Sequence, residues 1–415
     1  MSLEKLHGGI SKPIGDVLDR ALAGRELSVN DATLLLGASG ADLLALMQAA
    51  DVARREDKGD LVTYVVCRNM NFTNICYVGC SYCGFSRHKD DADAYDHPME
   101  ALVAKGRDAV ARGATEFCIQ GGIHPAKNHT HYHEILTALK AAFPQVHIHA
   151  FSPEEQDFAQ RKSGGMPLAE LQRWLVDAGL GTMPGTAAEI LDDSVRRVIS
   201  PNKLRTERWI EIVTSAHSIG LRSTSTLMYG HIESTRHVAE HLLLLRELQK
   251  RTGGFTEFVP LGFIHERNIL FNHMHARPGS SAPEDLRLVA VARLLLRPWI
   301  TNIQVSWVKM GPKLAQLGLM SGANDFGGTL MEESISRESG SQHGENLPPE
   351  DFRRLIRGIG RTPVERNTTY GVLRRFDDPE KDPPSREPAH ERELSGPARW
   401  RLEKERAQPA PSPSS

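Results

Sequence analysis

Three of the five cysteines of the chain lie within eight residues, in the segment NICYVGCSYCGFSR. Cys76, Cys80 and Cys83 have the spacing C-x3-C-x2-C. Three thiolates can hold three irons of a [4Fe-4S] cube and leave the fourth iron open, whereas an electron-transfer cluster normally takes four cysteines. Structural zinc also favours four protein ligands, and His88, the nearest candidate, breaks the usual spacing. The segment therefore predicts a cluster with one open iron. A zinc knuckle or a chance grouping is the alternative.

An alternating α/β frame is expected to position these cysteines. From Leu61 onward, short β-rich segments alternate with longer helical ones, which predicts a parallel sheet with right-handed crossovers. About eight such units favour a closed, TIM-like (β/α)8 barrel, with an open doubly wound sheet as the alternative. The cysteines follow the first strand, on the face where parallel barrels carry their catalytic loops. The predicted strands are 61–66, 115–120, 146–151, 180–185, 221–229, 256–263, 302–310 and, weakly, 322–327.

Composition and pattern divide the chain into three segments. Residues 1–58 predict a helical segment that packs on the barrel, and residues 59–376 predict the barrel itself. Residues 377–415 are rich in Pro, Ser and charge and too poor in apolar residues to build a core, so we expect a largely disordered tail.

Composition and charge narrow the class of protein. The chain has 50 basic and 52 acidic side chains, so no polyanion-binding surface and no nucleic acid partner is indicated. The first residues carry no apolar core of signal-peptide length, and no uncharged run is long enough for a membrane span. An odd number of cysteines, three of them clustered, does not suit a disulfide framework. We expect a soluble cytoplasmic protein.

The cysteine motif at this place in a barrel resembles the radical SAM superfamily. There, S-adenosylmethionine (SAM) binds the open iron, and its reductive cleavage yields a 5'-deoxyadenosyl radical. Tyr82 matches the aromatic position that lies near the adenine in that superfamily, although it could simply pack the loop. Gly121 and Gly122, in QGGIHP after the second strand, match the glycine pair that receives the methionine end of SAM.

A closer resemblance covers about residues 60 to 370. The ordered motifs are similar to those of the tyrosine-dependent subunit of FO synthase, the 5-amino-6-(D-ribitylamino)uracil:L-tyrosine 4-hydroxyphenyl transferase family. They are RNMNFTNICYVGCSYCGFSR, QGGIHP, HIHAFSPEE, MPGTAAEILDD, STSTLMYGHIE, FVPLGF, NIQVSWVKMG and GANDFGGTLMEESISRESGSQHG. Departures from the family pattern include Cys67, Met70 and the charged stretch HKDDADAYDHPME.

This resemblance implies a reaction and its partners. Hydrogen abstraction from L-tyrosine would break its Cα–Cβ bond, and the 4-hydroxybenzyl radical would add to 5-amino-6-(D-ribitylamino)uracil, giving the precursor of the deazaflavin FO. A separate cyclising FO synthase subunit and an electron donor such as a ferredoxin or flavodoxin are implied as partners.

Further site residues are expected at other strand ends. Ser152 and Glu189 follow the third and fourth strands, where related enzymes present polar groups to SAM; the alternatives are a helix cap and a solvated helix face. His149 and His231 are candidates for moving protons, or are satisfied core histidines. In the late-barrel loop, the candidates for binding the uracil or ribityl chain are Asn324, Asp325, Glu332 and Glu333, with acidic solvation as the alternative.

Two other features predict structural roles. HTHYH, residues 129–133, looks like a metal tract but predicts the start of an outer helix, with His129 and His133 on one face. Cys67 and Cys118 lie in or beside predicted strands and predict buried apolar packing.

Two other functions remain open. One is a radical SAM enzyme of the futalosine route to menaquinone, either the cyclase or the aminofutalosine synthase, which shares the NxTNxC and HAFSP patterns. The other is a noncatalytic iron–sulfur or zinc protein.

Overall fold

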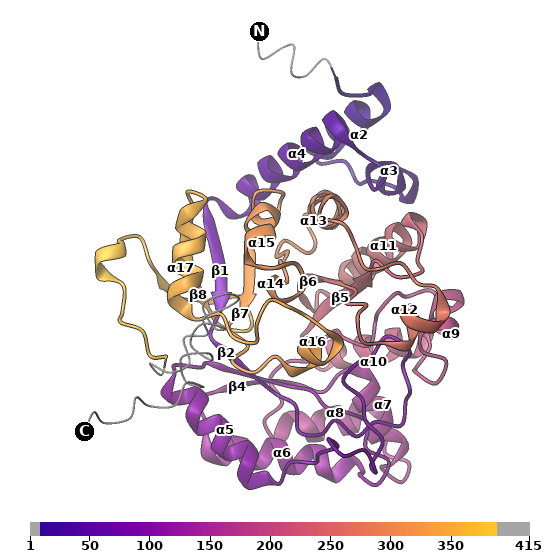
Figure 1. Cartoon of the computed structure of the whole chain (residues 1–415), viewed down its shortest axis with the longest axis vertical. Helices are drawn as coiled ribbons and strands as arrows, with labels where there is room; N and C mark the ends of the chain where they lie inside the picture. Colours follow the sequence, from indigo (N-terminus) through magenta and orange to yellow (C-terminus); the bar gives the residue numbers. More distant parts are fainter. Residues whose placement is uncertain (1–8, 388–415) are drawn as a thin grey trace, which may run out of the picture.

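A ring of parallel strands forms the centre of the molecule in the computed structural model, which describes residues 9–387 (Figure 1). Parallel pairing joins β2, β3 and β4, then β5 and β6, and finally β7 and β1. Single parallel bridges complete the ring at Thr182 and Met183 and at Ile303 and Gln304. The strands are β1 (Leu61–Val65), β2 (Cys67–Met70), β3 (Glu116–Ile119), β4 (His147–Ala150), β5 (Ser223–Tyr229), β6 (Phe255–Gly262) and β7 (Asp325–Gly328). The predicted TIM-like barrel is confirmed.

The predicted fourth and seventh strands differ in extent from the observed ones. Residues 180–185 join the ring only through Thr182 and Met183. Residues 307–310 of the seventh predicted strand are helical and form α14 (Trp307–Met310). A short apolar run does not distinguish a strand from a buried helical turn by its periodicity, and tertiary contacts decide. Here the Trp307 indole donates to the Gly328 carbonyl at 2.9 Å, which fixes the turn against β7.

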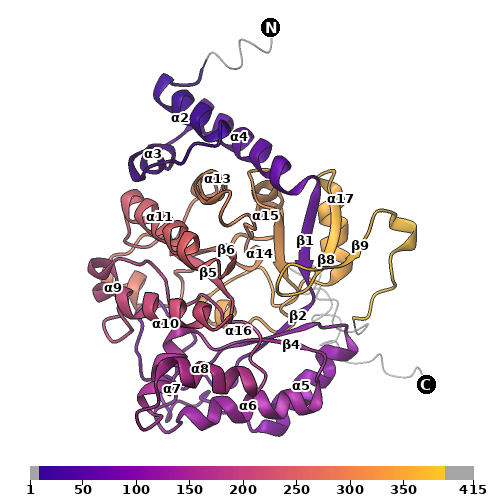
Figure 2. The same ribbon diagram turned by 180° about the vertical axis from the view of Figure 1, so that it is seen from behind.

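Helices surround the strands on the outside, as Figure 2 shows from behind. Local signals explain several of their ends: Ser234 caps α11, and Gly253, with φ of 63°, ends it in the left-handed conformation. They are α5 (Met99–Ala111), α6 (His129–Ala142), α7 (Pro153–Arg161), α8 (Leu168–Asp177), α9 (Asp193–Ile199), α10 (Thr206–Ser218), α11 (Thr235–Thr252), α12 (Ile269–Met274), α13 (Ala282–Leu296), α15 (Pro312–Leu319), α16 (Ser334–Ser339) and α17 (Pro349–Gly358).

Three N-terminal helices lie outside this ring, at one end of the molecule (Figure 1). They are α2 (Lys12–Leu22), α3 (Val29–Leu35) and α4 (Gly40–Lys58). The segment is held to the barrel by polar contacts: Arg246 donates to the Leu27 carbonyl at 2.9 Å, and Arg361 pairs with Asp51 at 2.8 Å. Their buried apolar side chains belong to the same core cluster as those of the barrel.

Two strands near the C-terminus were not predicted from the sequence. β8 (Thr362–Arg366) pairs parallel with β1, and β9 (Val372–Arg375) returns antiparallel to β8. The first part of the expected tail, residues 377–387, includes the short 3-10 helix η1 (Pro379–Lys381) and contacts α17. Asp382 pairs there with Arg353 and Arg357 at 2.9 and 2.7 Å. The rest of the expected tail, 388–415, lies outside the described residues.

No single helix among residues 9–387 is long and apolar enough to cross a bilayer. Within the same range, only α3 and α4 taken together reach the length and composition of a span, and they are bent by 120° at their junction.

Candidate active site

The cysteine loop lies between β2 and α5 and forms one wall of a cavity of about 240 Å³. Cys76, Cys80 and Cys83 all line this cavity and are partly buried. Backbone bonds fix the loop: Cys76 N–H donates to the Arg87 carbonyl at 3.1 Å, and Cys83 N–H to the Cys80 carbonyl at 3.1 Å. Ser81 anchors the loop to the end of α9, since both its N–H and its hydroxyl donate to the Ile199 carbonyl, at 2.9 and 2.8 Å.

These thiols suit a cluster better than free nucleophilic chemistry. Burial raises the pKa of Cys80 to about 12 and also raises the pKa of Cys83. A bound metal deprotonates such a thiol outright, whereas without metal it stays protonated and unreactive at neutral pH. In the described part of the chain, no three His, Cys, Asp or Glu side chains converge on a single ion position. A cubane does not require this convergence, because each iron takes its own thiolate.

Tyr82 and Glu189 meet across the cavity through a lysine that the sequence analysis missed. Lys203 Nζ donates to the Tyr82 hydroxyl at 2.8 Å and to Glu189 Oε1 at 2.7 Å, and the Tyr82 hydroxyl donates to the same oxygen at 2.7 Å. Despite burial, the Lys203 charge lowers the pKa of Glu189, so the pair is ionised. Glu189 is thus buried and ion-paired, and the alternative of a solvated helix face is wrong.

The glycine pair faces the same cavity, and packing explains why neither position tolerates a side chain. A Cβ on Gly121 would lie 2.6 Å from the Phe72 ring, and one on Gly122 would lie 2.3 Å from the Ile75 carbonyl oxygen. Gly122 N–H donates to the Thr73 carbonyl at 2.8 Å. The pair therefore allows the strand end to pack directly against the start of the cysteine loop, while it leaves open backbone on the cavity side.

Ser152 lines the cavity and also caps α7. Its N–H and hydroxyl both donate to Glu155 Oε2 at 2.7 Å, and Gly121 N–H donates to Glu155 Oε1 at 3.1 Å. The helix-cap interpretation is confirmed. Glu155, which the sequence analysis missed, links the glycine pair to the cap.

Glu155 makes stability depend on pH in a defined direction. Burial raises the pKa of Glu155 from its ordinary 4.5 to about 7, so the folded state binds more protons than the unfolded state between those values. Its contribution to stability is therefore present below about pH 4.5 and decreases as the pH rises to about 7. We expect wild type to lose unfolding free energy relative to Glu155→Gln over this range. Urea denaturation at several pH values measures the difference; parallel pH profiles would contradict the prediction.

A second cavity, of about 250 Å³, lies inside the barrel and adjoins the first. The two share five lining residues: Gln120, Thr186, Leu261, Lys309 and Ile335. Glu116, His149, Glu257 and Arg366 also line the second cavity. Burial lowers the pKa of His149 to about 3, and its Nδ1 shares a hydrogen bond with the Thr182 hydroxyl at 2.7 Å, so this imidazole is neutral. Cys67 and Cys118 are also on this wall, so they face a cavity as well as the core.

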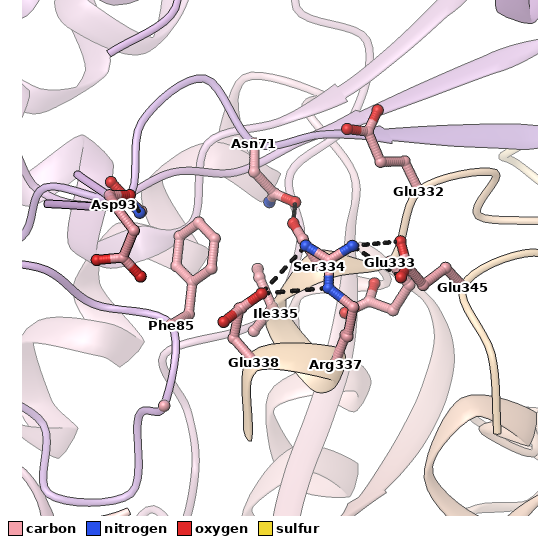
Figure 3. A network of polar contacts seen from close by, with 12 residues as sticks. Asn71, Phe85, Asp93, Glu332, Glu333, Ser334, Ile335, Arg337, Glu338 and Glu345 are labelled. Atoms are coloured by element: carbon pink, nitrogen blue, oxygen red, sulfur yellow. Dashed lines mark hydrogen bonds and ion pairs between the residues drawn. The ribbon is translucent and has the colours of Figure 1, made fainter. Parts of the chain in front are cut away.

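The segment after β7 covers the site through the short helix α16. Figure 3 shows Arg337 between two carboxylates, Glu338 on α16 and Glu345 beyond it. Ser334 donates to Asn71 Oδ1 at 2.7 Å, and Ile335 lines both cavities. A Cβ on Gly84 would lie 2.7 Å from the Glu338 carbonyl oxygen, so α16 rests directly on the cysteine loop. This helix therefore closes the site from the side of the last strand.

Three of the late-barrel candidates do not reach either cavity. Asn324 accepts from Arg293 at 2.7 Å and from Ile303 N–H at 2.9 Å. Asp325 is fully buried and binds Arg366 through both oxygens, at 2.5 and 3.1 Å. Glu332 pairs with Arg68 at 2.7 Å and Lys105 at 2.5 Å. Asp325 and Glu332 neutralise cations of the fold, and Asn324 accepts hydrogen bonds within it, which a local sequence motif does not reveal.

The remaining candidates divide between cavity and core. Glu333 lines the barrel cavity, caps α16 at Ser336 N–H and accepts from Asn69. His231 is buried beside Glu233, 3.2 Å away, and does not line either cavity. In the HTHYH segment, His129 and His133 share the helix face of α6 that packs on Trp174, with ring centroids 5.4 and 4.1 Å apart, as a structural role predicts.

Comparison with known proteins agrees with this fold and places the chain in a family. The family model of the radical SAM superfamily matches residues 70–245, and the model described as the CofH/MqnC C-terminal region matches residues 252–378. Solved structures share the fold at low identity. HydG, the FeFe-hydrogenase maturase of Carboxydothermus hydrogenoformans, has a TM-score of 0.66 at 16% identity, covering 86% of this chain and 80% of that one. Methylornithine synthase has a TM-score of 0.64 at 17% identity, and the match covers 84% of this chain and 97% of that one.

Curated relatives are much more similar in sequence. The 5-amino-6-(D-ribitylamino)uracil–L-tyrosine 4-hydroxyphenyl transferase of Methanothermobacter thermautotrophicus is 45% identical over 354 residues, which are 85% of this chain and 96% of that protein. The protein of the same name from Methanoculleus marisnigri is 46% identical, over 87% of this chain and 98% of that protein. FO synthase of Mycobacterium tuberculosis is 49% identical over 82% of this chain, but this chain covers only 40% of its length.

The radical SAM superfamily uses a [4Fe-4S] cluster and SAM, and the three thiols in the first cavity fit that cluster. Both the superfamily model and the near full-length relatives support the resemblance found in the sequence. The chain belongs to the radical SAM superfamily and, within it, to the family of 5-amino-6-(D-ribitylamino)uracil–L-tyrosine 4-hydroxyphenyl transferases.

Proposed function

We propose that this protein cleaves L-tyrosine and adds its 4-hydroxybenzyl group to 5-amino-6-(D-ribitylamino)uracil, making the precursor of the deazaflavin FO. The observation that carries the proposal is the identity of 45 to 46% to transferases of this name over almost their entire length. The two adjoining cavities support it, because the reaction needs a place for SAM beside a place for two further substrates.

The residues of the first cavity suit the binding of cluster and SAM. Bound together, these groups supply a 5'-deoxyadenosyl radical, which abstracts hydrogen. Cys76, Cys80 and Cys83 would hold the cluster, and Gly121 and Gly122 offer backbone at close approach. The ion-paired Glu189, Tyr82 and Ser152 present polar groups to a nucleoside and an amino acid end.

Closure of the site by α16 supports radical chemistry in the second cavity. Ile335 and Ser336 on α16 line this cavity, and Ser334 fastens the helix to Asn71. A benzyl radical that must travel from one substrate to another requires both to be held close and water to be kept out. The covered junction between the cavities meets this requirement.

The proposed reaction needs two further proteins, one to cyclise its product and one to supply an electron. Archaeal relatives with the transferase name match over 93 to 98% of their own length, whereas FO synthase of Mycobacterium tuberculosis is covered to only 40%. We propose that a separate cyclising subunit closes the adduct to the deazaflavin, and that a ferredoxin or flavodoxin supplies the electron.

A futalosine-pathway activity is the second candidate, because the C-terminal family model describes CofH and MqnC together. The experiment uses the anaerobically reconstituted protein with SAM and a strong reductant. Tyrosine is supplied with and without the diaminouracil, and products are identified by mass spectrometry. We expect 5'-deoxyadenosine together with a hydroxybenzyl adduct that requires both substrates. Turnover of a futalosine instead, or SAM cleavage without any adduct, would overturn the proposal.

A further inference from the structure

The two lysines that line the cysteine cavity differ in their partners. Lys203 is neutralised by Glu189 at 2.7 Å. Lys309 lies on α14, which follows the strand segment of Ile303 and Gln304. Among residues 9–387, its ammonium group has neither a hydrogen bond nor an ion pair. Burial lowers the pKa of Lys309. The carboxylates that act on it, Glu333 and Glu189, are already bonded to Asn69 and Lys203, and the Cys83 thiol acts on it from the cysteine loop. A partly buried cation without a counter-ion favours an anionic ligand group.

Lys309 lies at the junction of the two cavities, since it lines both. The strand segment before Lys309 bridges β6 and β7. Counted around the ring of strands, it is three positions from β3, and β3 precedes Gly121 and Gly122. The function proposed above places SAM against the open backbone of that glycine pair. The anion for Lys309 therefore belongs to another molecule, one that reaches from the barrel cavity toward the cluster.

The opposite end of the barrel cavity is acidic. Glu116 is the first residue of β3, is 6% exposed and, within residues 9–387, has no hydrogen bond or ion pair on its carboxylate. Glu257 lies near the start of β6, 5% exposed. The Tyr370 hydroxyl and the Gln304 amide donate to its Oε2, at 2.5 and 3.0 Å, and the Arg366 guanidinium, which Asp325 neutralises, lies 3.7 Å from the same oxygen. In the same described range, its Oε1 has no protein donor. Buried carboxylate oxygens facing a cavity favour a ligand rich in N–H and O–H groups.

Resting on the function proposed above, we propose that the two substrates divide this cavity by charge. Lys309 holds the α-carboxylate of tyrosine at the junction with the cysteine cavity, and Glu116 and Glu257 form hydrogen bonds with the amino and hydroxyl groups of the diaminouracil at the floor. Tyrosine is the substrate with a carboxylate, whereas the diaminouracil carries many donors and no anion. This arrangement places the bond that breaks in tyrosine between SAM and the acceptor ring.

Binding of tyrosine tests the cationic end without turnover. The reconstituted protein with SAM and no reductant is titrated by calorimetry with tyrosine and with tyramine, which lacks the carboxylate. We expect wild type to prefer tyrosine by about tenfold or more, as for other charge-assisted hydrogen bonds, and Lys309→Met to lose this preference. Lys309→Arg should restore part of it. Lys313→Met, which removes an exposed lysine on α15, is the matched control and should keep it. An unchanged preference in Lys309→Met would overturn the assignment.

Steady-state kinetics test the acidic end. Glu116→Gln and Glu257→Gln should raise KM for the diaminouracil by about tenfold, while their affinity for tyrosine stays within about twofold of wild type. Lys309→Met should show the reverse pattern. If both glutamine variants keep the wild-type KM for the diaminouracil, the floor assignment is wrong. If wild type forms no adduct and binds neither substrate, the proposed function itself fails, which is a different result.

A folding defect in a variant can be distinguished from the loss of a substrate contact. Removal of an unpaired buried charge relieves desolvation, so Lys309→Met should unfold at the wild-type temperature or above. Glutamine preserves the oxygen that Tyr370 and Gln304 use on Glu257. Iron content and the unfolding midpoint of each variant verify both points, and the tyrosine-to-tyramine ratio is independent of the fraction of active protein.

Discussion

Cys80→Ser is expected to abolish both the cluster and the cleavage of SAM. In the described part of the chain, Cys80 is one of three thiols that line this cavity. A serine hydroxyl is a much poorer iron ligand, so two cysteines would remain to hold the cubane. After anaerobic reconstitution we expect iron and sulfide to fall to background, and 5'-deoxyadenosine to fall at least a hundredfold, a loss of about 3 kcal/mol or more in transition-state stabilisation. Iron analysis, visible absorbance and product quantification measure these effects.

Cys118→Ser is the matched control for this variant. Cys118 is also free, but it lines the barrel cavity and does not line the cysteine cavity, so it should keep the full iron content. A Cys80→Ser protein that still binds four irons and cleaves SAM would refute the assignment of the site. Loss of the cluster in Cys118→Ser as well would indicate a general folding defect rather than a missing ligand.

Arg366→Met is expected to give the largest loss of stability. Asp325 is fully buried and Arg366 is its bidentate partner, with distances of 2.5 and 3.1 Å. Removal of one member of a buried pair leaves an uncompensated charge and costs about 3 to 5 kcal/mol. The Thr63 hydroxyl at 2.5 Å and Gly327 N–H at 2.8 Å remain as donors, but they do not supply a charge. Urea denaturation of the cluster-free protein measures the change in unfolding free energy.

Two comparisons make this prediction specific. Arg375→Met removes a surface arginine of β9 that is about half exposed, and it should change the unfolding free energy by less than about 0.5 kcal/mol. The double variant Asp325→Asn with Arg366→Met should recover part of the loss, because it no longer buries an unpaired charge. If Arg366→Met is as stable as Arg375→Met, the buried pair does not stabilise the barrel.

The same pair also shapes the site. Arg366 lines the barrel cavity beside Glu257, and its guanidinium lies 4.1 Å from the centre of the Tyr370 ring. Asp325 holds this arginine in place from the core side, although it does not line the cavity itself. Its role at the site is therefore the positioning of a cavity wall, which differs from the substrate contact that its place in the loop suggested.

The sequence by itself determined the features that depend on residues close together in the chain. Cluster ligands must be near one another, so C-x3-C-x2-C predicted Cys76, Cys80 and Cys83 as ligands, and all three line one cavity. Alternation of β-rich and helical segments determined the barrel, because each parallel strand needs a crossover before the next. The cap at Ser152 was also local, since a capping serine bonds within its own first turn.

Only the tertiary structure decided how buried charges are paired. Glu189 bonds Tyr82, which is 107 positions away in the chain. Asp325 pairs with Arg366, which lies on β8, a strand that the sequence did not predict. Lys309 has no partner among the described residues. A buried ion is stabilised by whichever opposite charge the fold brings within reach, and local sequence does not encode that distance. For this reason the acids of the late motif looked like substrate ligands, while Lys203, Lys309, Glu116 and Glu257 became visible only in the folded barrel.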